Sequence, residues 1–415
     1  MSDIATLPAA GESPAAAADA AGRPVLHLQP GGHRRGEAGH PWIYSNEIVM
    51  DAAAKALPAG TLVTLRRADE RPFGVAMFNP HTLIAARLLD RDAGREINRR
   101  FFARRLERAL HIRERLYDRP FYRLVHAEAD GLPGLVVDRF GPVLVVQANT
   151  AGMGRLTPLV VAALRDLVQP EAIVFRNDSP ARTLEGIELE TTIAFGAVDA
   201  PVPVEEANGT VFLADVLGGQ KTGWFFDQRD NRAFVAQLAR GLRVLDLYCY
   251  SGGFAVGAAR GGAASVLGIE RSEPALALAG EAARRSGVVD TCEFRRAEVF
   301  AEAAALAGRG ERFDIVIADP PAFARSKKDV GAALRGYRKL ARLAAQATAP
   351  GGFLFIASCS HNVGIAEFTE AVRQGLADAG RAGRILRSAG ASADHPVHPA
   401  LPETAYLKAL TLALD

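Results

Sequence analysis

Apolar positions in the first half of the chain alternate in short runs that glycine and proline interrupt. Runs such as TLVTLRR (61–67) and FGVAMF (73–78) predict a small β-rich domain between about residues 23 and 95. Apolar residues then recur at helical spacing over INRRFFARRLERALHIRERLY (97–117), which predicts a helix. The hairpin-like and helical patterns that follow predict a small α+β domain, so that this second unit spans 96–204.

From about residue 205 the apolar runs become continuous, and most are separated by alanine-rich helical stretches. These runs are RVLDLY (243–248), SVLGIE (265–270), CEFRRAE (292–298), FDIVIAD (313–319) and GFLFIAS (352–358). Strands that are buried on both faces of a parallel sheet have this character. We therefore predict an α/β fold for residues 205–415, with an open Rossmann-like sheet and helices on both faces. Ligands of such sheets bind outside the carboxyl ends of the strands, so the functional residues are expected there.

The composition is that of a globular protein with more than one domain. Of the 415 residues, 49% are hydrophobic and 23% charged, which excludes a wholly disordered or fibrous chain. No apolar run reaches the roughly 18 residues that a spanning helix needs, so no membrane partner is expected. Residues 1–22 contain no lysine, arginine or apolar core, and they predict a disordered extension rather than a signal peptide. We therefore expect a cytoplasmic protein.

The charge distribution and the cysteine content limit the kinds of binding site that the chain can form. The net charge is only +2, but acidic and basic stretches are unevenly distributed and arginine far outnumbers lysine. Arginine suits phosphate binding, although a genome-wide compositional bias explains the preference equally well. The three cysteines, Cys249, Cys292 and Cys359, are too few and scattered for a disulfide framework or a zinc ribbon. The histidines lack the paired spacing of metal ligands, and no metal site is expected.

Small residues follow the first strand of the predicted sheet. This strand ends near Asp246, and Ser251, Gly252 and Gly253 precede a helix of small residues. Such a turn lets a ligand approach the backbone, and the free N–H groups of a helix start bind polar atoms. The second strand ends in Glu270, which can accept hydrogen bonds from ribose hydroxyls or act as an ordinary acid at a helix start. The absence of a GxGxxG pattern disfavours a dehydrogenase, so an adenosine without a diphosphate is favoured.

Polar residues also follow the other strands. Glu298, after the third strand, is a weaker candidate for contact with the adenine side. The fourth strand ends in Asp319, and the two prolines that follow hold the chain extended and remove amide donors, so that a planar substrate can lie beside the carboxylate. The fifth strand is followed by Cys359, whose position at the rim of the sheet favours a nucleophile over a buried structural thiol. For Cys249 and Cys292 the structural role is favoured.

Taken together, the segment from Asp246 through Cys359 resembles a class I S-adenosylmethionine (SAM)-dependent methyltransferase. More closely, the chain resembles the bacterial large-subunit ribosomal RNA cytosine-C5 methyltransferases with an N-terminal PUA domain. HPWIYSNEI (40–48) is similar to the PUA signature of that family, KTGWFFDQRDNR (221–232) to the segment that leads into its catalytic domain, and DHPVHPALPETAYLK (394–408) to its closing strand region. The resemblance covers nearly everything after the first 22 residues, and it implies a mostly parallel sheet with an antiparallel last strand.

The resemblance also implies roles for individual residues. Cys359 would add to C6 of cytosine, and Asp319 would support protonation at N3. The residues that would hold SAM are Asp246, Tyr248, Ser251, Gly252, Gly253, Glu270, Glu298 and Asp319. Those that would close over the substrate or the cofactor are Phe226, Asp227, Gln228, Arg229, Pro320 and Phe323. No cysteine follows Asp319 as it does in the two-cysteine RNA methyltransferases, so the base that removes the C5 proton is unassigned, with Lys327 and His361 as candidates.

The expected partner is large-subunit ribosomal RNA, with a homodimer also possible. Arg34, Arg35 and Trp42 belong to the PUA-like region, which would recognise structured RNA through its shape and backbone. The arginines of 97–117 would add phosphate contacts or form a solvated helix face. A flipped target base could stack on Phe323 or Tyr337.

Two alternatives remain open at this point. An rRNA methyltransferase that modifies a guanine nitrogen would keep the fold and cofactor but would not need Cys359. A non-catalytic RNA-binding or assembly protein would not need an intact set of Asp246, Glu270, Asp319 and Cys359. The particular nucleotide, and whether the substrate is naked rRNA or an assembled particle, do not follow from the sequence.

Overall fold

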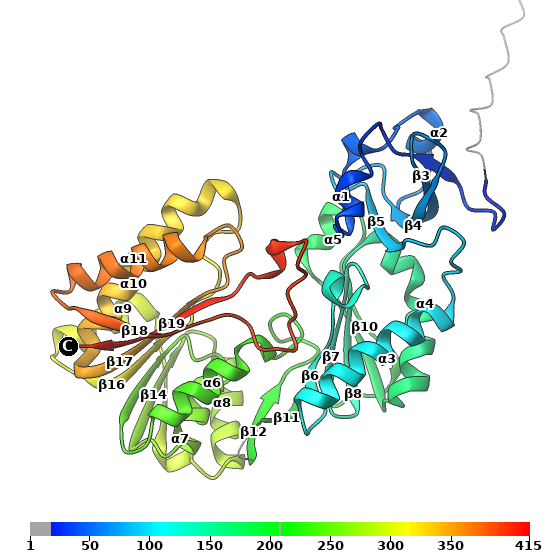
Figure 1. Cartoon of the computed structure of the whole chain (residues 1–415). Helices are drawn as coiled ribbons and strands as arrows, with labels where there is room; N and C mark the ends of the chain where they lie inside the picture. Colours follow the sequence, from blue (N-terminus) through cyan, green and yellow to red (C-terminus); the bar gives the residue numbers. More distant parts are fainter. Residues whose placement is uncertain (1–17, 207–208) are drawn as a thin grey trace, which may run out of the picture.

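The computed structural model describes residues 18–206 and 209–415, in which four β-sheets follow one another along the chain (Figure 1). The first sheet has the order β1-β3-β4-β5-β2. Its strands are β1 (Val25–His27), β2 (Trp42–Ile43), β3 (Thr61–Arg66), β4 (Pro72–Phe78) and β5 (Ala86–Asp90), with the short helices α1 (Arg34–Glu37) and α2 (Ala52–Lys55). Alternate residues of β3 (Val63 and Leu65) and β4 (Ala76 and Phe78) pack in one hydrophobic core, in agreement with the alternating apolar pattern of the sequence.

The expected extension over 1–22 is only partly described by the structure. Residues 1–17 lie outside the described residues. Asp19, however, is attached to the first sheet, because its carboxylate accepts hydrogen bonds from Thr64 Oγ1 at 2.6 Å and from the Arg23 guanidinium. Partial burial raises the pKa of Asp19, but these hydrogen bonds outweigh it and lower the pKa to about 2. The prediction of a segment without packing contacts was therefore wrong for Asp19.

The second sheet has the order β10-β9-β8-β7-β6 and forms the middle unit. It consists of β6 (Phe121–His126), β7 (Leu135–Phe140), β8 (Val143–Ala148), β9 (Ala172–Asn177) and β10 (Glu190–Gly196), with α3 (Arg99–Leu116), α4 (Ala151–Val168) and α5 (Pro180–Leu184). Helix α3 begins where the Asn98 side chain accepts a hydrogen bond from the Phe101 amide. The predicted helices and the β7–β8 hairpin are confirmed.

A two-stranded hairpin, β11 (Val202–Glu206) and β12 (Thr210–Ala214), leads into a seven-stranded sheet of order β15-β14-β13-β16-β17-β19-β18. The strands are β13 (Arg243–Leu247), β14 (Ser265–Glu270), β15 (Cys292–Arg296), β16 (Phe313–Ala318), β17 (Thr348–Ser358), β18 (Gly383–Ala389) and β19 (Lys408–Leu414). Strands β13 to β17 are parallel, and β19 runs antiparallel between β17 and β18. The predicted α/β sheet with an antiparallel last strand is confirmed, although 394–407 forms a connection before β19 rather than part of that strand.

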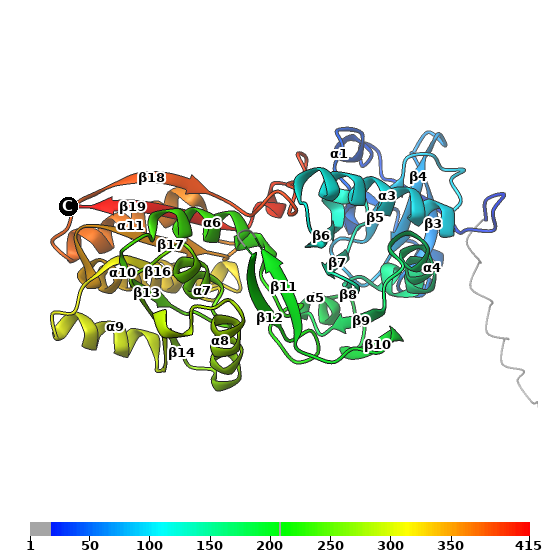
Figure 2. The same ribbon diagram turned by 90° about the horizontal axis from the view of Figure 1, so that it is seen from below.

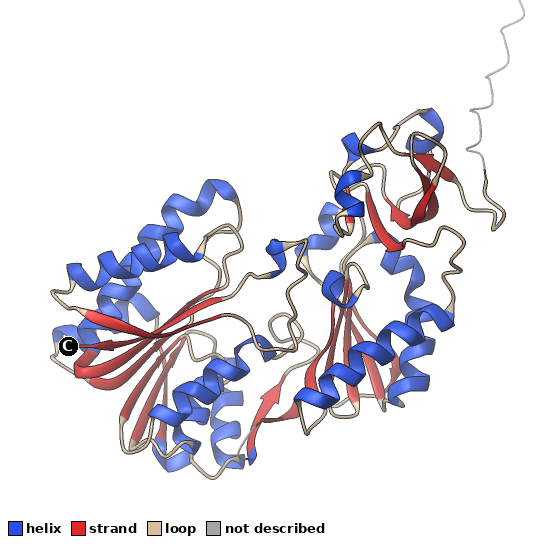
Figure 3. Cartoon of the chain, in the orientation of Figure 1, coloured by secondary structure: helices blue, strands red, loops and turns tan. Residues whose placement is uncertain are grey.

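Helices cover both faces of this sheet (Figure 3). The helices are α6 (Arg229–Leu238), α7 (Gly253–Arg260), α8 (Glu273–Arg285), α9 (Val299–Gly308), α10 (Val330–Ala347) and α11 (Ile365–Asp378). Residues of α9, α10 and α11 share one core with the sheet, and residues of α6 and α7 share the core on its other face. Because β13, β14 and β16 are buried on both sides, their apolar runs are continuous, whereas the edge strand β15 has no buried residue. None of the described helices is long and apolar enough to cross a membrane.

The 390–407 segment connects the seven-stranded sheet to the middle unit. In Figure 2 this segment and the β11–β12 hairpin lie between the two lobes. The backbone carbonyl of Asp394 accepts a hydrogen bond from the Arg113 guanidinium at 2.9 Å, and its side chain accepts one from the Arg123 amide at 2.9 Å. Arg113 is fully buried and also pairs with Asp130 at 2.7 Å. These buried contacts fix the position of the seven-stranded sheet relative to the middle sheet.

Candidate active site

The turn after β13 has an unusual backbone. Tyr248, Tyr250 and Gly252 all have positive φ, at 68°, 47° and 83°. A non-glycine residue in this region costs roughly 1–2 kcal/mol, and such strain concentrates at ligand sites. The turn is held by hydrogen bonds from the Cys249 amide to the Ile269 carbonyl and from the Gly252 amide to the Cys249 carbonyl. It ends at the start of α7, whose first N–H groups have no partner within the helix.

Gly252 is the position in this turn where a side chain is least tolerable. An added Cβ would lie 3.1 Å from both Ala279 Cβ and Val256 Cγ2, at a φ of +83°. We expect Gly252→Ala to destabilise the protein by about 1–2 kcal/mol, measured by urea denaturation. Gly257→Ala, inside α7 with nothing within 4 Å, is the matched control and should stabilise by about 0.5–1 kcal/mol. Equal effects of the two substitutions would contradict this interpretation of the turn.

Asp246 and Ser251 are buried beside this turn without partners. Asp246 is 1% exposed and Ser251 0%. Burial, followed by the nearby charge of Asp319, raises the pKa of Asp246 well above its ordinary value. The Ala255 amide faces the carboxylate and offsets this in part, but neither carboxylate oxygen nor Ser251 Oγ makes a hydrogen bond of ordinary geometry. A buried carboxylate without a partner is costly, so this site suits a ligand that brings a cation or hydrogen-bond donors.

The two predicted glutamates differ in position. Glu270 is half-buried at the end of β14, and its carboxylate accepts hydrogen bonds from the amides of Tyr250, Arg271 and Ser272. It therefore lies at the turn. Glu298 is exposed and caps α9 by accepting a hydrogen bond from the Ala301 amide at 2.8 Å. Burial and then the charges of Glu298 and Glu270 raise the pKa of Tyr248, so this phenol shares their electrostatic environment.

Asp319 and Cys359 follow two neighbouring parallel strands, β16 and β17, in which Ala318 is paired with Ile356. Both side chains are half-buried. Burial and the charge of Asp227 raise the pKa of Asp319 to about 7, although Lys221 and a hydrogen bond from Gln228 lower it. Asp319 therefore binds a proton over much of the neutral range.

The Cys359 thiol shares this electrostatic environment. Burial raises its pKa, Lys221 opposes the increase, and Asp319 and Asp227 add to it. Lys408 donates a hydrogen bond from Nζ to the Ser360 carbonyl at 2.6 Å, next to the cysteine. The thiol is therefore protonated at rest and needs a base to become a nucleophile.

A further group of side chains closes the site around Asp227. Tyr406 donates a hydrogen bond to Asp227 Oδ2 at 2.5 Å, and Lys221 Nζ lies 3.6 Å from the same oxygen. The His361 ring stacks on Tyr406 with 5.1 Å between centroids. Lys221 lies in KTGWFFDQRDNR and Tyr406 in DHPVHPALPETAYLK, but neither was predicted to be a site residue. Membership in those two segments was the only signal for them.

Several of the predicted substrate contacts are packed against other parts of the chain. Phe226 is only 1% exposed and packs on Phe140, and Arg229 donates to the Phe121 carbonyl with its guanidinium over a tyrosine ring. Both therefore anchor the segment to the middle unit and are not free to close over a ligand. Pro320, a predicted substrate contact, is buried, and Tyr337, a predicted stacking partner of the base, is 0% exposed.

The remaining predicted residues are more accessible. Phe323 is half-buried, but one face of its ring is covered by Tyr337 at 4.7 Å. Lys327 is exposed at the start of the 3₁₀ turn Lys327–Asp329. In the first sheet, Trp42 is half-buried and donates to Glu128 of the middle unit at 2.8 Å.

The arginines of the first half of the chain do not behave uniformly. Arg34 is exposed, and the guanidinium of Arg35 lies over the Tyr44 ring at 4.5 Å. On α3, Arg105 is half-buried and donates hydrogen bonds to backbone carbonyls, and Arg99 forms an ion pair with Asp166. The predicted phosphate contacts of this helix remain a prediction.

The sheet order, the strained turn after its first strand and the acid at the end of the second define a class I SAM-dependent methyltransferase. Residues 163–411 match the family model of S-adenosylmethionine-dependent methyltransferases, and residues 26–91 match a PUA-like domain. The chain is 37% identical over 379 residues to ribosomal RNA large subunit methyltransferase I of Aeromonas hydrophila, covering 90% of this chain and 95% of that protein. The protein of the same name from Shewanella denitrificans is 35% identical over 93% of this chain and 98% of its own. The chain therefore belongs to the family of SAM-dependent ribosomal RNA large subunit methyltransferases I.

Solved structures share the whole architecture. A structure from Streptococcus mutans, described as a SAM-dependent methyltransferase, aligns with a TM-score of 0.77 at 19% identity, over 94% of this chain and 99% of that one. A methyltransferase complexed with SAH aligns with a TM-score of 0.79 at 20% identity and the same coverage. At this identity the likeness shows the fold alone.

The residues at the turn fit SAM, the cofactor of this family. The unpartnered Asp246 carboxylate and Ser251 hydroxyl suit the cationic amino-acid part of SAM, and the small residues Gly252 and Gly253 leave the backbone open. Glu270, at the end of β14, stays the predicted acceptor of hydrogen bonds from the ribose hydroxyls. In the part of the chain that the structure describes, no cluster of three or more metal-ligating side chains is present.

Proposed function

We propose that this enzyme methylates large-subunit ribosomal RNA at C5 of a cytosine, with Cys359 as the covalent nucleophile. The observation that carries the proposal is the placement of a thiol and a protonatable carboxyl at the ends of adjacent strands, next to the expected SAM turn. The relatives named ribosomal RNA large subunit methyltransferase I supply the RNA class. The PUA-like domain supports RNA as the substrate. The domain limits, the homodimer and the cytoplasmic location remain predictions.

Cytosine C5 is a poor nucleophile, and the residues of the site supply the activation it needs. When bound, SAM supplies an electrophilic methyl group. The Cys359 thiol first loses its proton to solvent, and the thiolate adds to C6 while the Asp319 proton moves to N3, so that electron density develops at C5. After C5 takes the methyl group, a base removes the C5 proton, the C5–C6 double bond forms again, Cys359 leaves as a thiolate and N3 returns its proton to Asp319. Lys221 is placed to stabilise both anionic forms of the thiol and the carboxyl.

The pKa directions predict a particular pH profile. The reactive form needs Asp319 protonated, with a pKa of about 7, and Cys359 ionised, with a raised pKa. The fraction in this form rises with pH up to about 7 and is then constant, because the gain in thiolate cancels the loss of the Asp319 proton. We expect kcat/KM to show this break between pH 5.5 and 9.

The variant Asp319→Asn tests whether Asp319 is the group that causes the break near pH 7. The variant should lose about 10²–10⁴ in rate, and its activity should continue to rise above pH 7 because only the thiol still titrates. A break near pH 7 that survives in Asp319→Asn would show that another group is responsible.

The direct test is transfer of a labelled methyl group from SAM to deproteinised large-subunit rRNA, followed by analysis of the nucleosides. Label in 5-methylcytidine supports the proposal. Label in a methylguanosine would replace it with the guanine alternative. No label on naked or particle-bound rRNA, despite SAM binding, would favour other RNAs and then the binding-protein alternative.

A further inference from the structure

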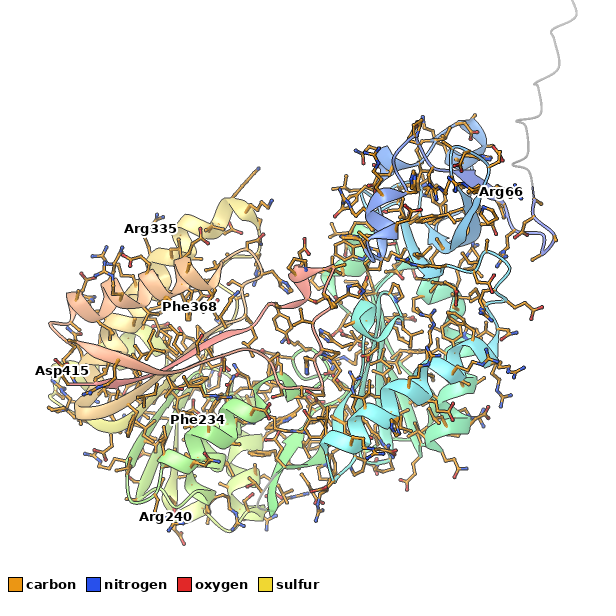
Figure 4. All side chains as sticks on the ribbon, in the orientation of Figure 1. Arg66, Phe234, Arg240, Arg335, Phe368 and Asp415 are labelled. Carbon is orange, nitrogen blue, oxygen red and sulfur yellow. The ribbon has the colours of Figure 1, made fainter. Side chains whose placement is uncertain are left out.

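A strongly basic stretch follows the Asp319-Pro320-Pro321 turn. Five of its side chains form no salt bridge in the described part of the chain, and we call them the basic strip: Arg325, Lys327, Lys328, Arg335 and Lys339. All five are exposed, and Figure 4 shows Arg335 on the outer side of α10. The one acid between Arg325 and Lys339 is Asp329, whose carboxylate accepts hydrogen bonds from the Ser326 amide and hydroxyl, both at 2.8 Å.

The basic strip differs from several arginine-bearing surfaces of the same half of the chain. On α8, Arg284 and Arg285 pair with Glu281, and Arg309 after α9 pairs with Glu311. Even Arg338, which lies on α10 between two members of the strip, pairs with Asp378 of α11 at 2.6 Å. Local ion pairs neutralise the field of those arginines, whereas the field of the strip is directed into solvent. A compositional bias toward arginine does not explain this contrast, because residues 325–329 (RSKKD) contain two lysines, Lys327 and Lys328.

The strip is rigidly connected to the neighbours of Cys359. The Ala324 amide donates a hydrogen bond to Ser360 Oγ at 3.2 Å, one residue before the strip begins. Tyr337, on the α10 turn between Arg335 and Lys339, is hydrogen-bonded to Ser360 Oγ at 2.9 Å and receives a hydrogen bond from Ser358 Oγ at 2.8 Å. The two serines flank Cys359 on both sides. Buried contacts therefore hold the strip at a fixed distance from the nucleophile.

We propose that the basic strip binds backbone phosphates of the RNA next to the target cytosine. The inference rests on the proposed function and deepens it, because a base that enters the site between Asp319 and Cys359 must carry its flanking phosphates past this edge of the sheet. The partner is identified by its charge: a strip of cations without salt bridges complements a polyanion and reads no sequence. One of them, Lys339, also places its Nζ 4.8 Å from the centroid of the Phe300 ring. The strip supplies position and affinity. We thereby assign Lys327, a sequence candidate for the base that removes the C5 proton, to phosphate binding instead.

The test compares two double variants that each remove two exposed positive charges. Lys327→Ala with Lys328→Ala removes part of the strip, and Arg284→Ala with Arg309→Ala removes ion-paired arginines elsewhere. Binding to deproteinised large-subunit rRNA is measured by filter binding from about 50 to 300 mM salt, together with KM for the rRNA and the Kd for SAM. For the lysine variant we expect affinity to fall about 10- to 30-fold near 150 mM salt, and the slope of log K against log salt to decrease in magnitude by about 1.4–1.8. The KM of the lysine variant for rRNA should rise in parallel, and its Kd for SAM should stay like that of wild type. The arginine control should match wild type in rRNA affinity, KM and Kd for SAM.

The outcomes separate this inference from the proposed function. If the lysine variant binds rRNA like wild type, or no worse than the arginine control, the proposal is overturned whatever the enzyme methylates. If wild type binds rRNA with the expected salt slope but produces no 5-methylcytidine, the proposed function fails while loss of slope in the lysine variant still supports the strip. A loss of SAM binding in the lysine variant would assign it a structural role and also overturn the proposal.

Discussion

Replacing Cys359 with alanine is expected to lower the single-turnover rate of methyl transfer by at least about 1,000-fold, because no other group can form the covalent bond to C6. The Kd for SAM should stay unchanged, since the thiol lies at the end of β17 and not in the turn after β13. The matched control is Cys292→Ala. Cys292 is half-buried, and burial raises the pKa of its thiol to about 12, so its loss should leave the rate like wild type.

A trapping experiment tests the same prediction by detecting the covalent adduct between enzyme and RNA. In rRNA that contains 5-fluorocytidine, fluorine occupies the position of the proton that must leave, so the enzyme should remain covalently attached to the RNA. This adduct should be stable in denaturing gels for wild type and Cys292→Ala and absent for Cys359→Ala. Methyl transfer that persists in Cys359→Ala would rule out the covalent mechanism while leaving the fold and the cofactor in place.

Replacing Asp246 with asparagine is expected to have two opposite effects. Removing the charge should weaken SAM binding about 10- to 100-fold, measured by calorimetry, because a charge-assisted hydrogen bond is lost. The same substitution should raise the melting temperature of the ligand-free protein by several degrees at pH 7–8, because it removes a buried carboxylate without a partner.

The sign of the second effect follows from the titration of Asp246. Its pKa in the folded protein lies well above the ordinary value of 3.8, so between these two pH values the folded protein binds more protons than the unfolded chain. Stability is therefore lost as the pH rises through this window, and Asp246→Asn should abolish that loss. The control is Asp314→Asn, near the start of β16, where the carboxylate accepts a hydrogen bond from the Arg243 amide at the start of β13, at the opposite end of that strand from Asp246. This variant should bind SAM like wild type. If both variants lost SAM affinity equally, Asp246 would not be part of the SAM site.

The sequence by itself determined the elements of the catalytic half and the strand ends that carry its chemistry. The predicted runs at 243–248, 265–270 and 313–319 became β13, β14 and β16 within a residue or two. This worked because a strand buried on both faces must be apolar at every position, and that requirement is visible in a single chain. The carboxyl ends of parallel strands share one edge, so Asp246 and Asp319 could be assigned to the same region before their distances were known.

Only the tertiary structure decided which side chains meet at that edge. Tyr406 and Asp227 are separated by 179 positions and nevertheless share a hydrogen bond. Local patterns carry no information about such contacts, because a polar residue in a loop looks the same whether it is buried or solvated. The same limit applies to Phe226 and Tyr337: their aromatic side chains suit a ligand contact, and only the packing around them shows that other side chains cover their surfaces. Periodicity along the chain thus specified the sheet, and burial in three dimensions determined which polar groups remained free to react.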